Sequence, residues 1–376
     1  MTYREKETAK PTALDIKQMN RSNIYMLLHR TGGQSRQAIA NTLGLSLPTV
    51  VQNLTRMQQE GLVRDSGFQG NTGGRRAALY SVVPDARVAI GLDITNCRAS
   101  AVVVDLQGNL IAQRVLDIPF SRTEGYYARV GALVSGLLVP DRDRVLGVGI
   151  SLPGLISADG GSSYYCRVLG VDGITRGEFQ RDIPYPVCLC HDVAASAFAE
   201  SWQNQTDSFF YMMLSGSIGG AVFLNGTVYT GANHRSGEIG HMQLVENGRL
   251  CYCGRRGCAD PYCSSKPLTA LTDGDLPAFF ALLEKGDPSA AGIWDAYLHS
   301  LARVIHNLRM LFDCRIILGG HVGEYMEAYL PRLQALTREL DPFQDEAGYL
   351  TLCRVKTQAS AVGAALQYID RFVDSI

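Results

Sequence analysis

Apolar residues near the start of the chain recur at helical spacing and predict three helices. The first covers about residues 16–29. Ser35 is placed to cap a second helix that ends near Leu43, and Gly44 can adopt the left-handed turn that follows it. Ser46 is placed to cap the third helix. Two short helices joined by such a turn are typical of a helix-turn-helix.

The third helix has an apolar face and a polar face. Val50, Leu54 and Met57 form the stripe that we expect to be buried. The polar side chains expected to face away from this stripe, toward the major groove of DNA, are Thr49, Gln52, Asn53 and Arg56. Amide side chains pair with adenine edges, and a guanidinium pairs with guanine or with phosphate.

A hairpin is predicted after this helix, over about residues 62–82, with a glycine-rich tip that carries Arg75 and Arg76. Basic residues at such a tip are typical of a wing that contacts phosphate or the minor groove. The sequence therefore predicts a winged helix-turn-helix DNA-binding domain over residues 1–84. The alternative for the same pattern is a small helical bundle with a hairpin that contacts another protein.

From about residue 85 the pattern changes to apolar strands separated by helices. Three successive strands are expected over residues 87–116, and later strands end in glycine or aspartate. Strands that alternate with helices indicate an α/β fold with its sites at the strand ends. We expect residues 85–376 to form two strand-rich lobes that separate near residues 190–200 and enclose a cleft.

Charge is distributed unevenly along the chain. The chain has 46% hydrophobic and 19% charged residues, enough apolar material for sizeable cores. Residues 1–84 hold 11 Lys or Arg against 5 Asp or Glu, whereas the remainder holds 24 against 31. A basic module on an acidic body suggests that the first part meets a polyanion. Because no long apolar run or signal-peptide core exists, we expect no membrane insertion and a cytoplasmic, nucleoid-associated protein.

Four residues have the spacing of a zinc site. His241 precedes Cys251, Cys253 and Cys258, and three thiolates with one imidazole can hold a structural Zn²⁺ ion. Cytosolic thiols stay reduced, so this cluster favours metal over disulfides; the alternative is a loop of reduced cysteines. Cysteines expected to be small core residues are Cys97, Cys166, Cys188, Cys190, Cys314 and Cys353, and Cys263 is expected to be a bystander.

The order of motifs in the body resembles the ROK family of repressors and sugar kinases. The matching segments are 152–154, the surroundings of Asp192, 215–220, 237–241, 251–258 and 318–320. The resemblance covers roughly residues 86–370 and implies an actin/hexokinase-like duplicated ribonuclease-H fold, assembled as a homodimer or homotetramer. It also implies that the zinc loop at 241–258 uses the four ligands above. The helix-turn-helix resembles that of the repressor branch.

The resemblance also implies a sugar pocket. Asp192 matches the catalytic aspartate of the kinases, and the segment with Glu238 and His241 borders the sugar in this family. His191 precedes the aspartate, and Asn233 is expected to assist from a neighbouring loop. The alternative for Asp192 is a helix cap for the residues that follow it.

The phosphate-binding loops depart from the kinase pattern. The family's first loop reads Asp-x-Gly-Gly-Thr, where this chain has Asp93 followed by Ile, Thr95, Asn96 and Cys97. The second loop has Ser215, Ser217 and Ala221 where glycines are usual. The segment around Asp192 has His191 and Ala194 in place of two amides. Side chains in these loops keep phosphate away from backbone N–H groups, so we expect no kinase activity and only a vestigial base in Asp192.

These observations favour a transcriptional repressor that senses a sugar or sugar derivative and releases operator DNA when its lobes close. One alternative is an active sugar kinase that carries a regulatory DNA-binding domain. Another is a repressor controlled by a protein partner from sugar transport.

Overall fold

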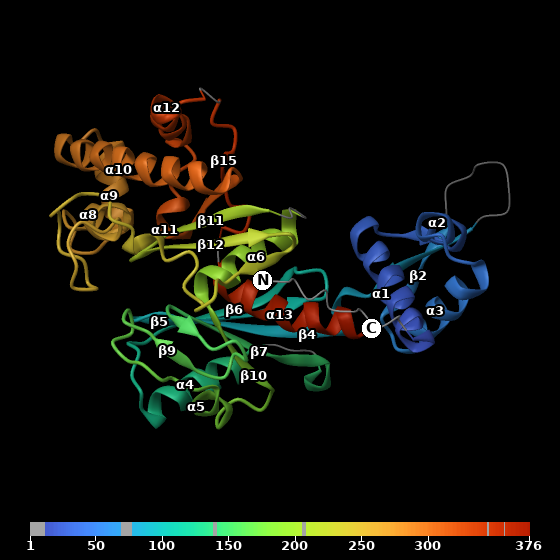
Figure 1. Ribbon diagram of the computed structural model, residues 1–376. Helices are drawn as coiled ribbons and strands as arrows, with labels where there is room; N and C mark the ends of the chain where they lie inside the picture. Colours follow the sequence, from blue (N-terminus) through green and yellow to red (C-terminus); the bar gives the residue numbers. More distant parts are fainter. Residues whose placement is uncertain (1–11, 69–76, 138–140, 205–207, 344–345, 357) are drawn as a thin grey trace, which may run out of the picture.

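A computed structural model describes residues 12–68, 77–137, 141–204, 208–343, 346–356 and 358–376. A small N-terminal module lies beside a larger body of two lobes (Figure 1). Within the described residues, no helix is long and apolar enough to cross a membrane.

The N-terminal module contains the three predicted helices. They are α1 (Ala13–Thr31), α2 (Arg36–Leu43) and α3 (Leu47–Gln59), and the strands are β1 (Gln34–Ser35), β2 (Val63–Phe68) and β3 (Ala78–Val82). The hydroxyls of Ser35 and Ser46 accept hydrogen bonds from the first turns of α2 and α3. Gly44 ends α2 with a φ of 63°. The predicted caps and turn are therefore confirmed.

The first lobe is built on a five-stranded sheet in the order β10-β7-β4-β5-β6. Its strands are β4 (Val88–Ile94), β5 (Arg98–Asp105), β6 (Leu110–Asp117), β7 (Val145–Leu152) and β10 (Val187–His191). Strands β4, β5 and β6 are antiparallel neighbours, whereas β7 runs parallel to β4 and β10. Helices α4 (Glu124–Ser135) and α5 (Arg176–Gln180) and the hairpin of β8 (Leu155–Ile156) and β9 (Ser163–Tyr165) complete this lobe.

The second lobe repeats this topology. Its sheet has the order β13-β12-β11-β14-β15, so again three antiparallel strands are followed by two parallel ones. The strands are β11 (Phe209–Leu214), β12 (Ile218–Leu224), β13 (Thr227–Tyr229), β14 (Arg315–Gly319) and β15 (Leu350–Leu352). The helices are α7 (Asp260–Cys263), α8 (Lys266–Thr269), α9 (Leu276–Glu284), α10 (Pro288–Phe312), α11 (Gly320–Gly323) and α12 (Leu330–Leu340). The same order in both sheets confirms the predicted duplication.

Two helices connect the parts of the body. α6 (Asp192–Asn204) leads from the first lobe to the second, and α13 (Ala359–Ser375) returns to pack against the first sheet. Backbones approach closely here: a Cβ atom on Gly363 would lie 1.7 Å from the carbonyl oxygen of Ala195, and one on Gly91 would lie 1.8 Å from that of Ala361. Glycine is required at both positions because any side chain would push the elements apart.

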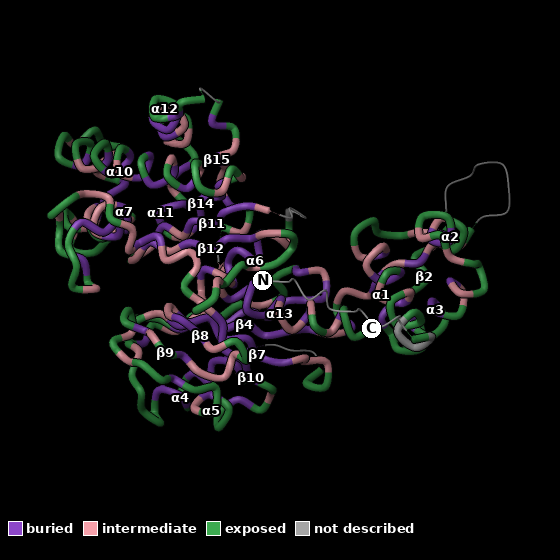
Figure 2. The backbone as a smooth tube through the Cα atoms, in the orientation of Figure 1, coloured by how far each residue is buried: buried purple, intermediate pink, exposed green. Residues whose placement is uncertain are grey.

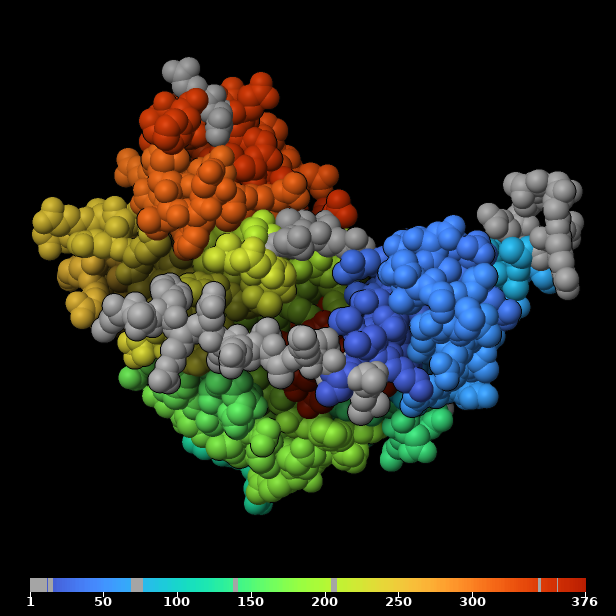
Figure 3. Space-filling model, turned by 45° about the vertical axis from the view of Figure 1, so that its right-hand side comes forward, coloured from blue at the N-terminus to red at the C-terminus, as the bar shows by residue number. Residues whose placement is uncertain are grey.

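The core of the N-terminal module continues into the body. Buried Ile24, Tyr25 and Leu28 of α1 belong to the same apolar cluster as Val373 and Ile376 at the end of the chain. Figure 2 shows buried residues in the module and in both sheets. In Figure 3 the dark red end of the chain is visible between the blue module and the body. The module is therefore attached through α1 and α13.

Candidate functional site

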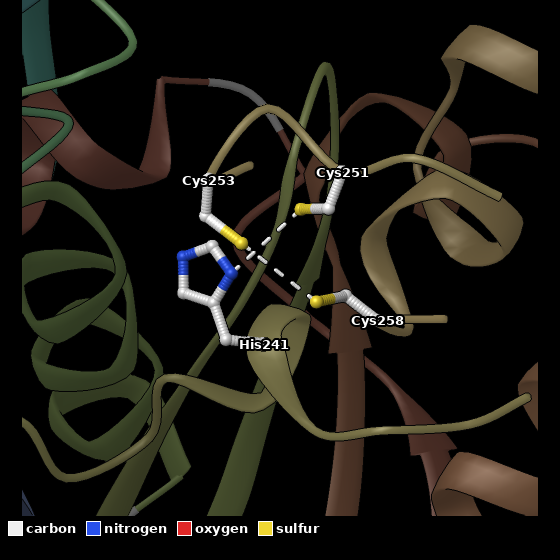
Figure 4. A group of neighbouring side chains, drawn as sticks. All are labelled: His241, Cys251, Cys253 and Cys258. Atoms are coloured by element: carbon white, nitrogen blue, oxygen red, sulfur yellow. Dashed lines mark hydrogen bonds between the residues drawn. The ribbon is translucent and has the colours of Figure 1, made fainter. Parts of the chain in front are cut away.

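Three cysteines and one histidine converge in the second lobe (Figure 4). The ligand atoms of His241, Cys251, Cys253 and Cys258 all lie within 4.8 Å of one another. The Sγ atoms of Cys253 and Cys258 are 3.8 Å apart, and Sγ of Cys251 is 3.8 Å from Nδ1 of His241. A tetrahedron with Zn–S bonds of about 2.3 Å has edges of about 3.8 Å. This donor set therefore fits a four-coordinate soft metal ion.

Local backbone geometry brings these ligands together. Gly254 and Gly257 adopt φ values of 85° and 81°, which glycine tolerates best. A Cβ atom on Gly257 would lie 1.7 Å from the carbonyl oxygen of Val245. Asp260, two residues after Cys258, is buried and accepts a hydrogen bond of 3.0 Å from the N–H of Ile218 on β12. The loop is thus tied directly to the second sheet.

Two carboxylates approach each other where β4 and β10 end. Asp192 is the first residue of α6, and its side chain is 19% exposed. Burial raises the pKa of Asp192 to about 7. Burial and then repulsion by Asp192 raise the pKa of Asp93 to about 6, although the hydroxyl of Ser151 donates a 3.0 Å hydrogen bond to it. Both groups therefore change charge near neutral pH.

Asp93 was expected only as part of a loop that departs from the kinase pattern, and its membership of this site was not predicted. The parallel pairing of β4 with β7 sets Asp93 opposite Ser151, and α6 starts where neighbouring β10 ends. The aspartate at the end of the first strand was the available signal, because parallel strands end at the same edge of a sheet.

His191 lies against Asp192, with its Nε2 atom 3.3 Å from Oδ1. Burial lowers the pKa of His191, and the nearby Glu238 carboxylate partly opposes this effect. Asp192 Oδ1 also accepts a 2.8 Å hydrogen bond from the N–H of Val193, the next residue, whereas a helix cap accepts from the second or third N–H of its helix. The structure thus brings His191, Asp192 and Glu238 into one neighbourhood.

His241 and Asn233 are placed differently. His241 belongs to the cysteine cluster through Nδ1, and its Nε2 atom lies 3.3 Å from the hydroxyl of Tyr252. Asn233 is exposed, and its backbone carbonyl accepts a 3.1 Å hydrogen bond from the hydroxyl of Tyr164 on β9. This bond joins the two lobes.

Side chains in the two loops that would face phosphate make local hydrogen bonds. Thr95 closes a tight turn, with its hydroxyl donating to the carbonyl of Arg98 at 3.2 Å. The Ser215 hydroxyl accepts a 3.3 Å hydrogen bond from the N–H of His321 in the first turn of α11. Cys97 is exposed, so the expectation that it is a core residue is wrong: it sits in this surface turn.

The predicted DNA-facing residues divide into four groups. Gln52 and Arg56 are exposed, and Arg56 Nε lies 3.1 Å from a carboxylate oxygen of Glu60. Thr49 is half-buried, with its hydroxyl 2.8 Å from that of Ser46. The expectation that Asn53 faces outward is wrong, because its side chain is buried and donates to the carbonyl of Thr49 at 2.9 Å. Arg75 and Arg76 lie outside the described residues.

Relatives of the chain include both repressors and kinases. The N-acetylglucosamine repressor of Escherichia coli O6:H1 (strain CFT073) is 25% identical over 347 residues, which cover 85% of this chain and 84% of the relative. The N-acetylmannosamine kinase of Yersinia pseudotuberculosis serotype O:1b (strain IP 31758) is 27% identical over 263 residues, covering 67% of this chain and 88% of the kinase.

The fold is also found in solved structures. A ROK family transcriptional regulator, described as a homologue of the E. coli MLC protein, superimposes with a TM-score of 0.75 at 21% identity. The match covers 96% of this chain and 97% of that one. The ROK family model matches residues 89–371. The chain therefore belongs to the ROK family.

Proposed function

We propose that the protein is a sequence-specific transcriptional repressor that binds operator DNA as a homodimer or homotetramer and is controlled by a sugar or sugar derivative. The observation that carries this proposal is the combination of two short helices joined by a tight turn with kinase-type phosphate loops that carry Thr95 and Ser215 in place of glycines. Relatives that are repressors of sugar genes support it, since the similarity to the N-acetylglucosamine repressor extends over 85% of this chain.

In this proposal α3 reads DNA. Gln52 and Arg56 are exposed on α3 and contact base edges or phosphate, with Thr49 beside them. Arg75 and Arg76 contact the backbone or the minor groove as a wing. Two modules in a symmetric dimer then bind an inverted repeat.

The effector is proposed to bind near His191, Asp192 and Glu238. These groups can accept hydrogen bonds from sugar hydroxyls and donate hydrogen bonds to them. This binding needs no ATP beside the sugar. His241 and Asn233 border this region from the second lobe. Thr95 and Ser215 place hydrogen-bonded side chains in the two loops that hold phosphate in the kinases, and this supports the inference that ATP does not have the role here that it has in the kinases.

A structural zinc ion is proposed for His241, Cys251, Cys253 and Cys258. The two 3.8 Å distances between ligand atoms, Cys253 Sγ to Cys258 Sγ and Cys251 Sγ to His241 Nδ1, fit a tetrahedral zinc site. The ion would fix the segment from Glu238 to His241 relative to the cleft.

Binding to a labelled promoter fragment of a carbohydrate operon tests the proposed function. We expect fluorescence anisotropy to show saturable, salt-sensitive binding that Arg56→Ala weakens, lowering the slope of log K against log salt by roughly 1 for each lost phosphate contact. Arg303→Ala is the matched control, since this arginine is exposed on α10 of the second lobe. Unchanged affinity in an Arg75→Ala, Arg76→Ala double variant would refute the wing.

The same purified protein can be used to test the two alternative functions. An active kinase would transfer phosphate from ATP to a sugar in a coupled assay, and we expect no such turnover. Control by a sugar-transport protein would appear as operator release by that protein in the absence of any sugar.

A further inference from the structure

The last turn of α6 reaches the N-terminal module. Val193 and Ala197, earlier in this helix, belong to the apolar cluster that covers the second sheet, together with Phe209 and Tyr211 of β11. Trp202 lies further along α6 and packs against the cluster that contains residues of α1 and α13. α6 therefore connects the layer that covers the second sheet with the part of the body to which the module is attached.

Trp202 packs on the turn between β5 and β6. Its Nε1–H group donates a 3.3 Å hydrogen bond to the carbonyl of Gln107. A Cβ atom on Gly108 would lie 2.9 Å from the indole, so the ring lies directly against this turn. The turn is held by buried Asp105, whose carboxylate accepts hydrogen bonds of 2.9 Å from the N–H groups of Gln107 and Asn109. The first lobe thus fixes the position of the Trp202 ring.

His29, near the end of α1, contacts both the turn and the indole. Its Nε2 atom lies 3.0 Å from the carbonyl oxygen of Leu106, and because a carbonyl can only accept, Nε2 carries the hydrogen. The rings of His29 and Trp202 meet edge-on, with centroids 5.5 Å apart and planes at 79°. One side chain of the module therefore touches the first lobe and the helix that covers the second sheet.

The helix that carries His29 also supports α3. Leu28 of α1 is buried in one cluster with Val50 of α3. α1 is held a second time about two turns before His29, where the hydroxyl of Ser22 donates a 3.3 Å hydrogen bond to the carbonyl of Val373 on α13. Because α1 is fixed at two separate points, its direction on the body is defined, and α3 follows it.

We propose that His29 and Trp202 form a joint that fixes the orientation of the N-terminal module on the body, and that this joint makes the protein select operators by the spacing of their half-sites. A dimer whose modules are held rigidly binds two half-sites only where their separation and rotation match. Modules released from the joint adapt to other spacings, because a flexible linkage tolerates a wider range of spans. The selection of spacing rests on the proposed function, whereas the joint itself does not.

The test compares DNA duplexes that differ only in spacing. The best duplex is selected from random DNA with the full-length protein, and two base pairs are then inserted between its half-sites, which turns one half-site by about 70°. We expect the wild type to bind the inserted duplex about 10-fold or more weakly, and His29→Ala and Trp202→Ala to reduce this ratio to about 3-fold or less. Affinity for a single half-site should stay within about 2-fold of wild type, since neither side chain lies on α3. Exposed His299→Ala on α10 is the matched control.

Hydrogen exchange gives a second readout that needs no DNA. Residues 22–31 and 105–109 should exchange faster in His29→Ala and in Trp202→Ala than in the wild type and in His299→Ala, because the module then opens more easily. The double variant should be no looser than the single ones, since both remove the same contact. If Trp202→Ala does not fold, His29→Ala removes the contact from the side of the module.

Three outcomes would overturn the joint. These are unchanged exchange in His29→Ala, an unchanged spacing ratio in that variant, and half-site affinity that falls as much as affinity for the full duplex. A wild type that selects no duplex counts against the proposed function alone, and hydrogen exchange then still decides whether the joint holds the module.

Discussion

The hydroxyl of Tyr164 donates a 3.1 Å hydrogen bond to the backbone carbonyl of Asn233, and this single contact joins the hairpin of the first lobe to a loop of the second. Tyr164 is 42% exposed, so water competes for both groups. A hydrogen bond of this kind contributes about 0.5–1.5 kcal/mol. It can therefore hold the lobes together without preventing them from opening.

Tyr164→Phe is expected to weaken the affinity for the effector by up to about 10-fold, because a ligand that favours the closed state must then close the lobes without this bond. The melting temperature should change little. Titration of operator release with the effector measures the shift. Arg338→Gln serves as a surface control, and an unaltered effector affinity in Tyr164→Phe would show that closure does not depend on this contact.

Stability should fall as pH rises from about 4 to about 7. The folded protein holds protons on Asp93 and Asp192 in this window, since their pKa values of about 6 and about 7 lie above the usual value of 3.8. The unfolded chain has already released them, so the folded state binds more protons and loses stability as they leave. Above about pH 7 this contribution is constant.

Asp192→Asn should remove most of that pH dependence and stabilise the protein at pH 8 by about 1–4 kcal/mol, at about 1.4 kcal/mol for each unit of pKa difference. Thermal unfolding at pH 5 and pH 8 measures the effect, with exposed Asp182→Asn as control. A wild-type protein whose stability rises with pH between 5 and 7 while Asp192→Asn behaves identically would contradict this assignment.

Removal of the metal should loosen the loop around His241. We expect about one zinc per chain in the wild type and a loss of most of it in Cys253→Ser, with a lower melting temperature in both the variant and the chelator-treated protein. Exposed Cys97→Ser is the control and should keep its zinc. Metal analysis by mass spectrometry decides, and a freshly purified wild type without any transition metal would rule out the site.

Gly363→Ala should separate α13 from α6. The new Cβ atom would lie 1.7 Å from a backbone carbonyl, so the helices must move, and overpacking of this kind costs about 1–3 kcal/mol or more. Gly125→Ala in α4 is the opposite case, because its Cβ atom would meet nothing within 4 Å, and we expect it to be neutral or slightly stabilising. Comparable melting temperatures in the two variants would disprove the close-packing argument.

The helix-turn-helix was predictable because its signals are local. Ser35, Gly44 and Ser46 act within one turn of their own helix, so sequence alone carries the information. Asn53 was mispredicted because it is three residues from Val50 and four from Met57, which places it within the buried stripe rather than beside it.

The strands of the body could be predicted from the pattern of apolar residues, and the duplication of its fold from the family motifs. The meeting of Asp93 with Ser151 and Asp192 depends on parallel pairing between residues 58 apart in β4 and β7 and 39 apart in β7 and β10, which periodicity does not contain. Likewise, the electrostatic contact between His191 of the first lobe and Glu238 of the second is not contained in local patterning. Only the tertiary fold makes them neighbours.

The position of α13 in the chain has a consequence for synthesis of the protein. The first sheet is made early, but the helix that packs across β4 and β7 is made only after the whole second lobe. A ribosome that stalls within the second lobe therefore releases a chain whose first sheet lacks its covering helix and whose α1 lacks the contacts of Val373 and Ile376. Such a fragment exposes apolar surface and becomes a substrate for chaperones or proteases.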